Sequence, residues 1–294
     1  MKQFGFYILG KKGYESLKSL ISVFGPECVS FVVAARDGNI EEDFFESIQK
    51  LCLENDVSFS DRSEFEDRDA SFRFAIGWRW IISNPKNLVV FHDSLLPKYR
   101  GFAPLVNALV NGENRIGVTA LKAEAQYDCG DICDQREVSV SYPLKIAEAI
   151  ENVSGLYSEM LVDICRKIIS KEKVEFVKQD SLHASYSLWR DQVDYRIDWR
   201  RGSKYIARFT DSVGYPYKGA ETTINGARVC LINCKVVEDV KVEARADHVG
   251  KVIFMRSGMP TVVCGDGLLE VIDVVDDSGE SLVGKIPFRS RFGF

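Results

Sequence analysis

Short apolar runs alternate with helical patterns in the first third of the chain, and this alternation restricts the fold more than any other feature. Residues 4–9 and 28–35 are apolar runs of strand length, and the segment between them has a helical pattern that ends near Phe24. A continuous apolar run is typical of a strand that is buried on both faces. Strands and helices joined by short connections predict a parallel sheet with helices on both of its faces.

The alternation continues along the chain. We expect helices over residues 41–55, 103–110 and 144–169, and strands over residues 72–76, 88–91, 117–122 and 137–140. The first loop, residues 10–13, has neither the dinucleotide-binding glycine pattern nor a P-loop. We therefore expect a Rossmann-like α/β domain with a parallel sheet over residues 1–200. Small ligands bind such a domain beyond the carboxyl ends of its strands.

The pattern changes near residue 222. Short alternating runs are now separated by turn residues, at Asn225-Gly226, at Gly258 and at residues 265–267. Short strands with regular turn signals predict an antiparallel β domain, here a small OB-like barrel over residues 201–294.

The chain is acidic, with a formal net charge of −5 and a sequence pI of about 5.5. A protein that wraps nucleic acid usually presents a basic face, so we expect no nucleic-acid partner. No apolar run approaches the roughly 18 residues that a membrane helix requires. The first residues also lack the apolar core of a signal peptide. We expect a cytoplasmic protein with no membrane partner.

Eight cysteines are scattered along the chain, several of them inside apolar runs, which favours buried thiols over disulfides. Cys129 and Cys133, like Cys230 and Cys234, have a spacing that occurs in zinc sites. None of the three histidines flanks these pairs, and we expect no metal site.

His92 directly follows a strand-like run, at the position where an open sheet presents ligands. A single histidine after a strand also suits a structural role. Here a loop bounded by Pro97 and Gly101 follows at once, and Asp128 lies in a polar turn after another strand. A His and an Asp at neighbouring loop ends could form an acid–base pair, although these patterns alone do not show that they meet.

Residues 92–101, His-Asp-Ser-Leu-Leu-Pro-Lys-Tyr-Arg-Gly, resemble the signature of the formyltransferases that use 10-formyltetrahydrofolate. That family includes methionyl-tRNA formyltransferase and the nucleotide-sugar N-formyltransferases. Gly-Val-Thr at residues 117–119 and the turn at Asp128 resemble its further motifs. Ile-Asp-Trp at residues 197–199 and Gly-Asp-Gly at residues 265–267 resemble its domain junction and its C-terminal OB-like barrel.

The resemblance implies a reaction and two catalytic residues. An amine attacks the formyl carbon carried on N10 of the folate, and the tetrahedral intermediate carries an oxyanion. The resemblance assigns to His92 a hydrogen bond to that oxygen or the handling of a proton. It assigns to Asp128 the orientation of His92 and help in deprotonating the amine.

Val90 departs from the family pattern, which has an oxyanion-binding Asn two residues before the His. The loss of one such donor typically costs about 2.7–4 kcal/mol, or roughly 100- to 1,000-fold in rate. Another donor could substitute, with Asn107 in the following helix as one candidate. Otherwise the protein is slow or inactive, or it uses a shifted mode of catalysis.

The remaining candidate residues fall into two groups, and each group has a plainer alternative. The folate group could instead form core aromatic packing, and the basic residues could form a solvated turn. For folate we expect Trp78, Arg79, Trp80, Leu95, Leu96, Pro97 and Asp131. For the acceptor and its phosphates we expect Ser94, Lys98, Tyr99, Arg100 and Gly101, with Trp189, Arg190, Tyr215 and Tyr217 near a nucleotide base.

The acidity of the chain favours a nucleotide-linked amino sugar, of the dTDP or UDP type, over transfer RNA as formyl acceptor. The product would serve surface polysaccharide, such as lipopolysaccharide. We then expect the C-terminal domain to support a homodimer. The alternatives are a methionyl-tRNA formyltransferase and a relative that binds folate or sugar nucleotides without chemistry.

Overall fold

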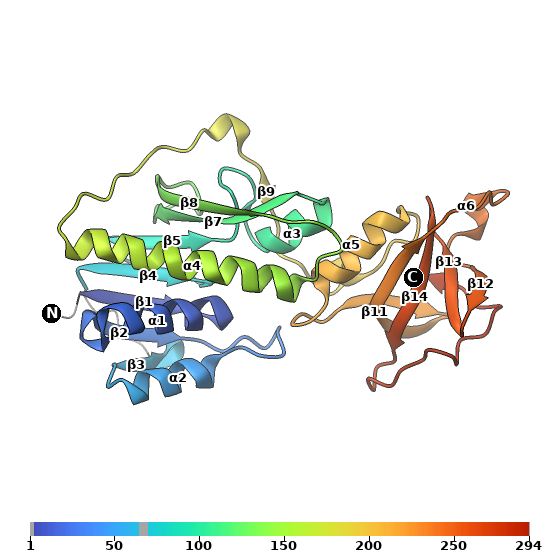
Figure 1. The fold of residues 1–294 in the computed structure, drawn as a ribbon, viewed down its shortest axis with the longest axis horizontal. Coiled ribbons are helices and arrows are strands. Elements are labelled where there is room, and N and C mark those ends of the chain that lie inside the picture. The colour runs from blue at the N-terminus through green and yellow to red at the C-terminus, as the bar shows by residue number, and fades with distance from the viewer. Residues whose placement is uncertain (1–2, 65–69, 294) are drawn as a thin grey trace. The chain divides into compact units, whose positions relative to one another are not determined.

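The structure is a computed structural model that describes residues 3–64 and 70–293, and its elements are labelled in Figure 1. The chain divides into two compact units. The first unit contains residues 1–105, 114–140 and 148–189, and the second contains residues 106–113, 141–147 and 190–294.

A seven-stranded sheet forms the first unit, in the order β3-β2-β1-β4-β5-β7-β8. Its strands are β1 (Phe4–Ile8), β2 (Val29–Ala34), β3 (Phe59–Asp61), β4 (Phe72–Ile76), β5 (Leu88–His92), β7 (Arg115–Lys122) and β8 (Ile132–Ser139). The predicted parallel pairing is confirmed for β1 to β5, whereas β7 and β8 run antiparallel. The connection between β7 and β8 is too short for the crossover that a parallel pair requires.

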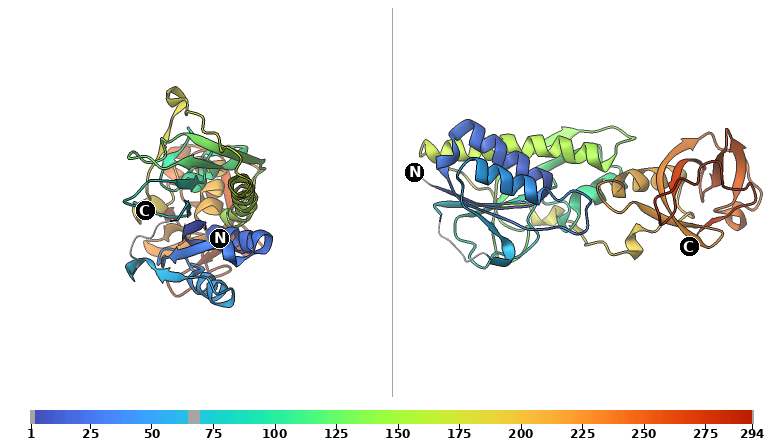
Figure 2. Two further views of the ribbon diagram at one scale, coloured as in Figure 1. Left: turned by 90° about the vertical axis from the view of Figure 1, so that its left-hand side faces the viewer. Right: turned by 90° about the horizontal axis from the view of Figure 1, so that it is seen from below.

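Three helices pack together on one face of this sheet, as Figure 2 shows: α1 (Gly10–Phe24), α2 (Phe45–Glu54) and α4 (Ile146–Ile169). Lys11 of α1 forms an ion pair with Glu151 of α4, and the Arg166 guanidinium of α4 lies over the Phe24 ring. The expectation of helices on both faces is wrong for strands β1 to β5. In the described part of residues 62–87, the chain that leads from β3 to β5 forms no α-helix.

The two faces of the sheet have separate cores. Alternation along the strands places Phe4, Phe6, Phe74 and Phe91 toward the helices, where Phe91 stacks on Tyr157 of α4 at 5.5 Å between ring centroids. The other face carries a buried cluster of Tyr7, Phe31, Val33, Ala75 and Leu88, covered by Trp78 and Ile82 of the loop after β4. Leu88, Val90 and His92 alternate along β5, so His92 points to this second face.

Several short elements lie outside the two larger sheets. Strands β6 (Arg100–Gly101) and β9 (Tyr186–Ser187) pair in parallel beside the sheet, and α3 (Pro104–Asn111) follows β6. The 3₁₀ helices are η1 (Pro26–Cys28), η2 (Arg62–Glu64), η3 (Ser181–His183) and η4 (Val193–Tyr195).

The second unit has an antiparallel sheet in the order β12-β13-β14-β11-β10-β15, as predicted for the C-terminal domain. Its strands are β10 (Ala220–Ile224), β11 (Ala227–Val237), β12 (Val252–Arg256), β13 (Met259–Val263), β14 (Leu268–Val275) and β15 (Phe292–Gly293). The outer strands meet, because the Phe292 N–H donates to the Gly250 carbonyl and the Val252 N–H donates to the Ser290 carbonyl. The sheet therefore closes into a small barrel.

Helix α5 (Ser203–Val213) precedes this barrel, and α6 (Arg245–His248) is a single turn within it. The sequence pattern did not reveal α5, because its buried positions include only three large apolar side chains, Ile206, Phe209 and Val213. Across the described residues, each helix is either too short or too polar to cross a bilayer.

Candidate active site

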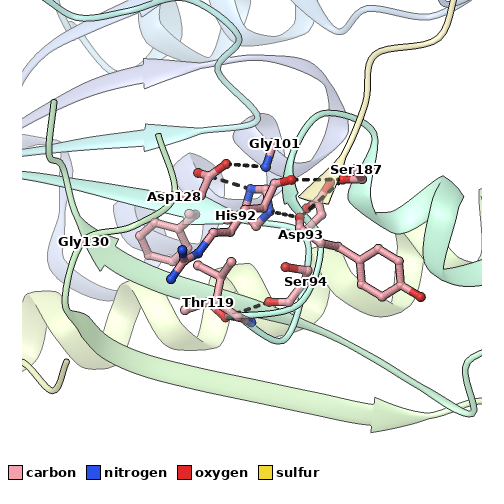
Figure 3. A network of polar contacts seen from close by, with 12 residues as sticks. His92, Asp93, Ser94, Gly101, Thr119, Asp128, Gly130 and Ser187 are labelled. Carbon is pink, nitrogen blue, oxygen red and sulfur yellow. Dashed lines mark hydrogen bonds and ion pairs between the residues drawn. The ribbon is translucent and has the colours of Figure 1, made fainter. Parts of the chain in front are cut away.

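His92 and Asp128 lie side by side at the end of β5, and Figure 3 shows the contacts around them. The Nδ1 atom of His92 is 3.5 Å from Oδ1 of Asp128. Their side chains are only 8% and 12% exposed. The strand places His92, and the connection between β7 and β8 brings Asp128 to it. The two residues that the sequence suggested as a pair therefore meet in a nearly buried position.

The loop after His92 folds back over this pair. The Gly101 N–H donates to Oδ2 of Asp128 at 2.8 Å, and Nε2 of His92 lies 2.8 Å from the Tyr99 carbonyl oxygen. The Ser94 hydroxyl donates to the Lys98 carbonyl and tightens the loop. Both ring nitrogens of His92 thus have partners within the protein.

Three residues of this arrangement have a positive φ, Tyr99 at 59°, Gly101 at 102° and Asp128 at 56°. A Cβ atom on Gly101 would lie 2.5 Å from the Ser187 carbonyl oxygen, so glycine is required here. A left-handed backbone is strained in residues other than glycine, here Tyr99 and Asp128, and such strain gathers at functional sites, where the surrounding contacts maintain it.

Thr119 and Gln135, from β7 and β8, hold the Leu95–Leu96–Pro97 part of the loop. The Thr119 hydroxyl donates to the Ser94 carbonyl at 2.7 Å and accepts the Leu96 N–H at 3.2 Å. The Gln135 amide donates to the Leu96 carbonyl and to the Thr119 hydroxyl. The sequence marked Thr119 only as part of the Gly-Val-Thr motif and did not single out Gln135, because these contacts join segments that are distant along the chain.

Arg100 differs from its expected place among phosphate-binding residues. It is 3% exposed, and its guanidinium donates to Oε1 of Gln179 at 2.7 and 3.1 Å. Lys98 next to it is exposed, and Tyr99 contacts His92 through its backbone. Lys98 therefore presents its charge to solvent, whereas the Arg100 guanidinium is buried and hydrogen-bonded within the protein.

A mostly buried ion pair lies on the opposite face of the sheet from the His92 side chain. Asp93 accepts hydrogen bonds from the Lys12 ammonium and from the Tyr157 hydroxyl, the latter at 2.5 Å. Burial raises the pKa of Asp93, but the charge of Lys12 and these two hydrogen bonds outweigh it, so the pKa lies below its usual value. Burial and the charge of Asp93 raise the pKa of Tyr157 well above its usual value.

The side chains of the segment after β4 mostly pack against other residues of the protein. Trp78 lies against the rings of Tyr7 and Trp80, at 5.5 and 5.0 Å between centroids. Arg79 forms an ion pair with the buried carboxylate of Asp37. Trp80 lies beneath the Arg62 guanidinium. The alternative of core aromatic packing, stated for these residues in the sequence analysis, thus describes most of this segment. The Trp78 Nε1–H, however, is buried and has no hydrogen-bond partner among the described residues.

Val90 packs against the same apolar cluster as Trp78 and offers no donor beside His92. Asn107 lies in the second unit, where its Oδ1 atom accepts a hydrogen bond from Arg190 at 2.6 Å. Tyr215 also belongs to the second unit and is exposed, as is Trp189 in the first. Asp131 is half-buried, and its carbonyl accepts the Lys122 N–H.

Three exposed aromatic rings adjoin the pair, and we call Phe102, Tyr127 and Tyr186 the aromatic edge. Their ring centroids lie 6.1 Å apart for Phe102 and Tyr127 and 6.5 Å apart for Tyr127 and Tyr186. They are 46%, 56% and 50% exposed. Phe102 follows Gly101 and Tyr127 precedes Asp128, so the edge is continuous with the backbone that holds the pair. No sequence pattern marks these three rings as a group.

The cysteines are all free thiols. Within residues 3–64 and 70–293, no three His, Cys, Asp or Glu side chains gather as metal ligands would.

Two family models match the chain. The model described as formyl transferase matches residues 70–165, and the model described as formyl transferase, C-terminal domain, matches residues 191–289. Together they span about two thirds of the chain.

Relatives of similar sequence include the methionyl-tRNA formyltransferase of Syntrophomonas wolfei, 30% identical over 62% of this chain and 57% of the relative. The methionyl-tRNA formyltransferase of Lactococcus lactis is 28% identical over 69% of this chain and 61% of the relative. The matched region thus spans less than two thirds of these relatives.

Two solved structures share the fold at low identity. WlaRD, a sugar 3N-formyl transferase in the presence of dTDP and 5-N-formyl-THF, superposes with a TM-score of 0.71 at 18% identity, over 92% of this chain and 97% of that one. The N-formyltransferase of Helicobacter canadensis, in complex with folinic acid and dTDP-3-aminofucose, gives 0.68 at 16% identity, over 92% and 99%.

Proposed function

We propose that this chain, which belongs to the formyl transferase family, transfers a formyl group from 10-formyltetrahydrofolate to the amino group of a nucleotide-linked amino deoxysugar. The observation that carries the proposal is the nearly buried His92–Asp128 pair, held at the carboxyl end of β5 by the Gly101 N–H and the Tyr99 carbonyl. A carboxylate-backed imidazole beside a ligand-binding edge suits proton transfer from an amine near neutral pH.

The proposed reaction moves one acyl group and one proton. The neutral amine attacks the formyl carbon, and a C–N bond forms while the carbonyl electron pair moves to oxygen. When the oxyanion collapses, the bond to N10 of the folate breaks, and N10 takes up a proton. The proton lost by the amine passes to the His92–Asp128 pair. Since Nε2 of His92 contacts the Tyr99 carbonyl, substrate must replace that contact before the ring can reach the reacting atoms.

For the folate side, we propose a pocket bordered by the Leu95–Pro97 loop and the Trp78 segment. Thr119 and Gln135 fix the loop, and the unpartnered Trp78 N–H could meet an acceptor atom of a pterin ring. The two solved structures of the same fold contain 5-N-formyl-THF and folinic acid, which supports folate as the donor.

For the acceptor side, the aromatic edge suits the apolar face of a sugar ring, because exposed aromatic rings beside a reacting centre offer stacking surface. The net charge of −5 and the dTDP compounds in both solved structures favour a nucleotide sugar. The second candidate acceptor is methionyl-tRNA, which the names of the sequence relatives favour. A homodimer, a cytoplasmic location and a role in lipopolysaccharide synthesis stay predictions.

The deciding experiment incubates the purified chain with 10-formyltetrahydrofolate and a panel of 3- and 4-amino nucleotide sugars, with methionyl-tRNA in parallel. Tetrahydrofolate release and the mass of the acceptor are followed. A gain of one formyl group on an amino sugar supports the proposal. Formylation of methionyl-tRNA alone overturns the proposal that a nucleotide sugar is the acceptor. Tight sugar-nucleotide binding without any turnover overturns the proposal that the chain is an enzyme.

A further inference from the structure

Gln179 connects the segment after α4 to the turn that carries Asp128. Its side-chain amide donates to the Asp128 carbonyl at 2.9 Å and to the Gly130 carbonyl at 2.7 Å. Its Oε1 atom accepts two hydrogen bonds from Arg100. One half-buried side chain therefore makes four hydrogen bonds, all within the first unit.

Arg100 fixes the orientation of this amide. A guanidinium has donors only, so the oxygen of the Gln179 amide must face it and the NH₂ group must face the turn. Rotation of the amide by half a turn would set NH₂ against the guanidinium and oxygen against two carbonyls. Because Arg100 is 3% exposed and two of its N–H groups donate to Gln179, this direction is strongly preferred.

The turn requires such a donor. Asp128 has a left-handed backbone, which for a residue other than glycine needs support from its surroundings. The NH₂ group of Gln179 binds the carbonyls on both sides of Cys129 and so fixes the backbone on each side of it.

The contacts form a closed circuit. The Asp128 carbonyl is tied through Gln179 to the Arg100 side chain, and the Asp128 carboxylate is tied to the N–H of Gly101, the next residue. The backbone and the side chain of Asp128 are thus both connected by hydrogen bonds to the same short strand, β6. The distance from the carboxylate to His92 depends on both ties.

We propose that Gln179 is a positioning residue, which sets the Asp128 carboxylate against His92 through the Asp128 turn and does not itself touch substrate. This inference rests on the proposed formyl transfer for its kinetic consequence. A purely structural alternative is that Gln179 only anchors residues 170–185 to the first unit. The two differ in what a substitution changes, because anchoring alters stability and binding, whereas positioning alters the chemical step.

Two substitutions distinguish the hydrogen bonds of Gln179 to Arg100 from its hydrogen bonds to the Asp128 turn. Gln179→Glu keeps an acceptor for Arg100 but replaces the two donors with a carboxylate against two carbonyl oxygens. Gln179→Met keeps the length of the side chain and removes all four hydrogen bonds. Gln126→Glu adds the same charge near the turn at an exposed position with no described role, and serves as the matched control.

We expect both Gln179 variants to lose kcat on the order of 100-fold, since a misplacement of about 1 Å can cost that much. The KM values and the 5-formyltetrahydrofolate affinity should stay near those of the wild type in both variants, and Gln126→Glu should keep wild-type kcat. Gln179→Glu should also keep the wild-type melting temperature, whereas Gln179→Met should lower it, because the buried Arg100 guanidinium and two carbonyls lose their partners. Wild-type kcat in Gln179→Glu overturns the proposal. So does a loss that appears in KM and melting temperature with kcat retained.

Crystal structures of the variants give a readout that does not depend on turnover. The proposal requires the Asp128 carboxylate to leave the Gly101 N–H or move from His92 in Gln179→Glu, and an unchanged turn overturns it. If the wild type transfers no formyl group, the proposed function fails, while this structural arm still decides the role of Gln179. If Gln179→Met does not fold, Gln179→Glu provides the decision, because it retains the pairing with Arg100.

Discussion

The backbone N–H of Gly101 donates a 2.8 Å hydrogen bond to Oδ2 of Asp128, while Oδ1 of the same carboxylate faces Nδ1 of His92. The two oxygens therefore have different tasks. Oδ2 fixes the carboxylate to the loop, and Oδ1 faces the imidazole ring of His92. The glycine is essential to this division, because its φ of 102° and the nearby Ser187 carbonyl both exclude a side chain.

Gly101→Ala should therefore separate the pair. The left-handed backbone costs an alanine about 1–2 kcal/mol, and the clash with the Ser187 carbonyl adds to this, so the strand must shift. We expect a lower melting temperature and a loss of kcat in a formyl-transfer assay. Gly226→Ala is the matched control, because Gly226 has a φ of 90° with no atom within 4 Å of an added Cβ. Equal kcat in both variants would contradict the role given to Gly101.

Asp128→Asn should abolish most of the activity with little effect on nucleotide affinity. The amide oxygen can still accept the Gly101 N–H, but the NH₂ group then faces His92 and can neither take up a proton nor balance a charge. His92→Asn removes the ring itself. Loss of a positioned acid–base group typically costs about 100- to 10,000-fold in rate. Steady-state rates and calorimetric binding of a nucleotide sugar test this, and wild-type rates in both variants would refute the assigned roles.

The buried parallel strands of the first unit were predicted well, because such strands appear as continuous apolar runs. The short and half-buried β3 was not predicted. β1, β2, β4 and β5 match the expected runs closely. β8 begins at Ile132, earlier than residue 137, because its partly exposed residues alternate too weakly to reveal its start. An edge strand with few buried side chains leaves little periodic signal. The placement of helices on one face depends on connections that carry no such signal.

The site was predictable only where a motif or a strand end marked it. His92 and Asp128 each follow such a marker. The ion pair of Lys12 and Asp93 joins residues 81 positions apart, and the contact of Arg100 with Gln179 spans 79. No local pattern encodes a contact of this kind. For the same reason Arg100 looked available for phosphate, since its burial is a property of the tertiary fold.

Asp93→Asn should destabilise the protein at neutral pH and reduce its sensitivity to acid. The folded-state pKa of Asp93 is lowered, so its stabilising contribution is present above the unfolded value of about 3.9 and is lost as pH falls through the folded value. Removing one partner of a fully buried pair typically costs about 3–5 kcal/mol. We expect a smaller loss here, because the side chains of Lys12 and Asp93 are 15% and 16% exposed and the charge left on Lys12 is partly solvated.

Urea unfolding of wild type and Asp93→Asn at pH 7 and below pH 4 measures this difference in the free energy of unfolding. The gap between the two proteins should narrow in acid. Lys12→Met with Asp93→Asn should recover part of the loss, since no buried charge then remains. A gap that is constant with pH would show that Asp93 acts through packing alone.

Val90→Asn tests what binds the oxyanion. Val90 lies two residues before His92 on the same face of β5 and packs against the apolar cluster beside Trp78. If no other donor occupies the oxyanion position, an amide there should raise kcat by up to roughly 100- to 1,000-fold. The polar group enters an apolar setting, so a loss of about 1–3 kcal/mol in stability should accompany the gain. Val90→Thr, which keeps the shape of valine and adds a hydroxyl too short for the same reach, is the control. An unchanged kcat in Val90→Asn, with wild-type turnover established, would mean that this chain already supplies its donor from another residue.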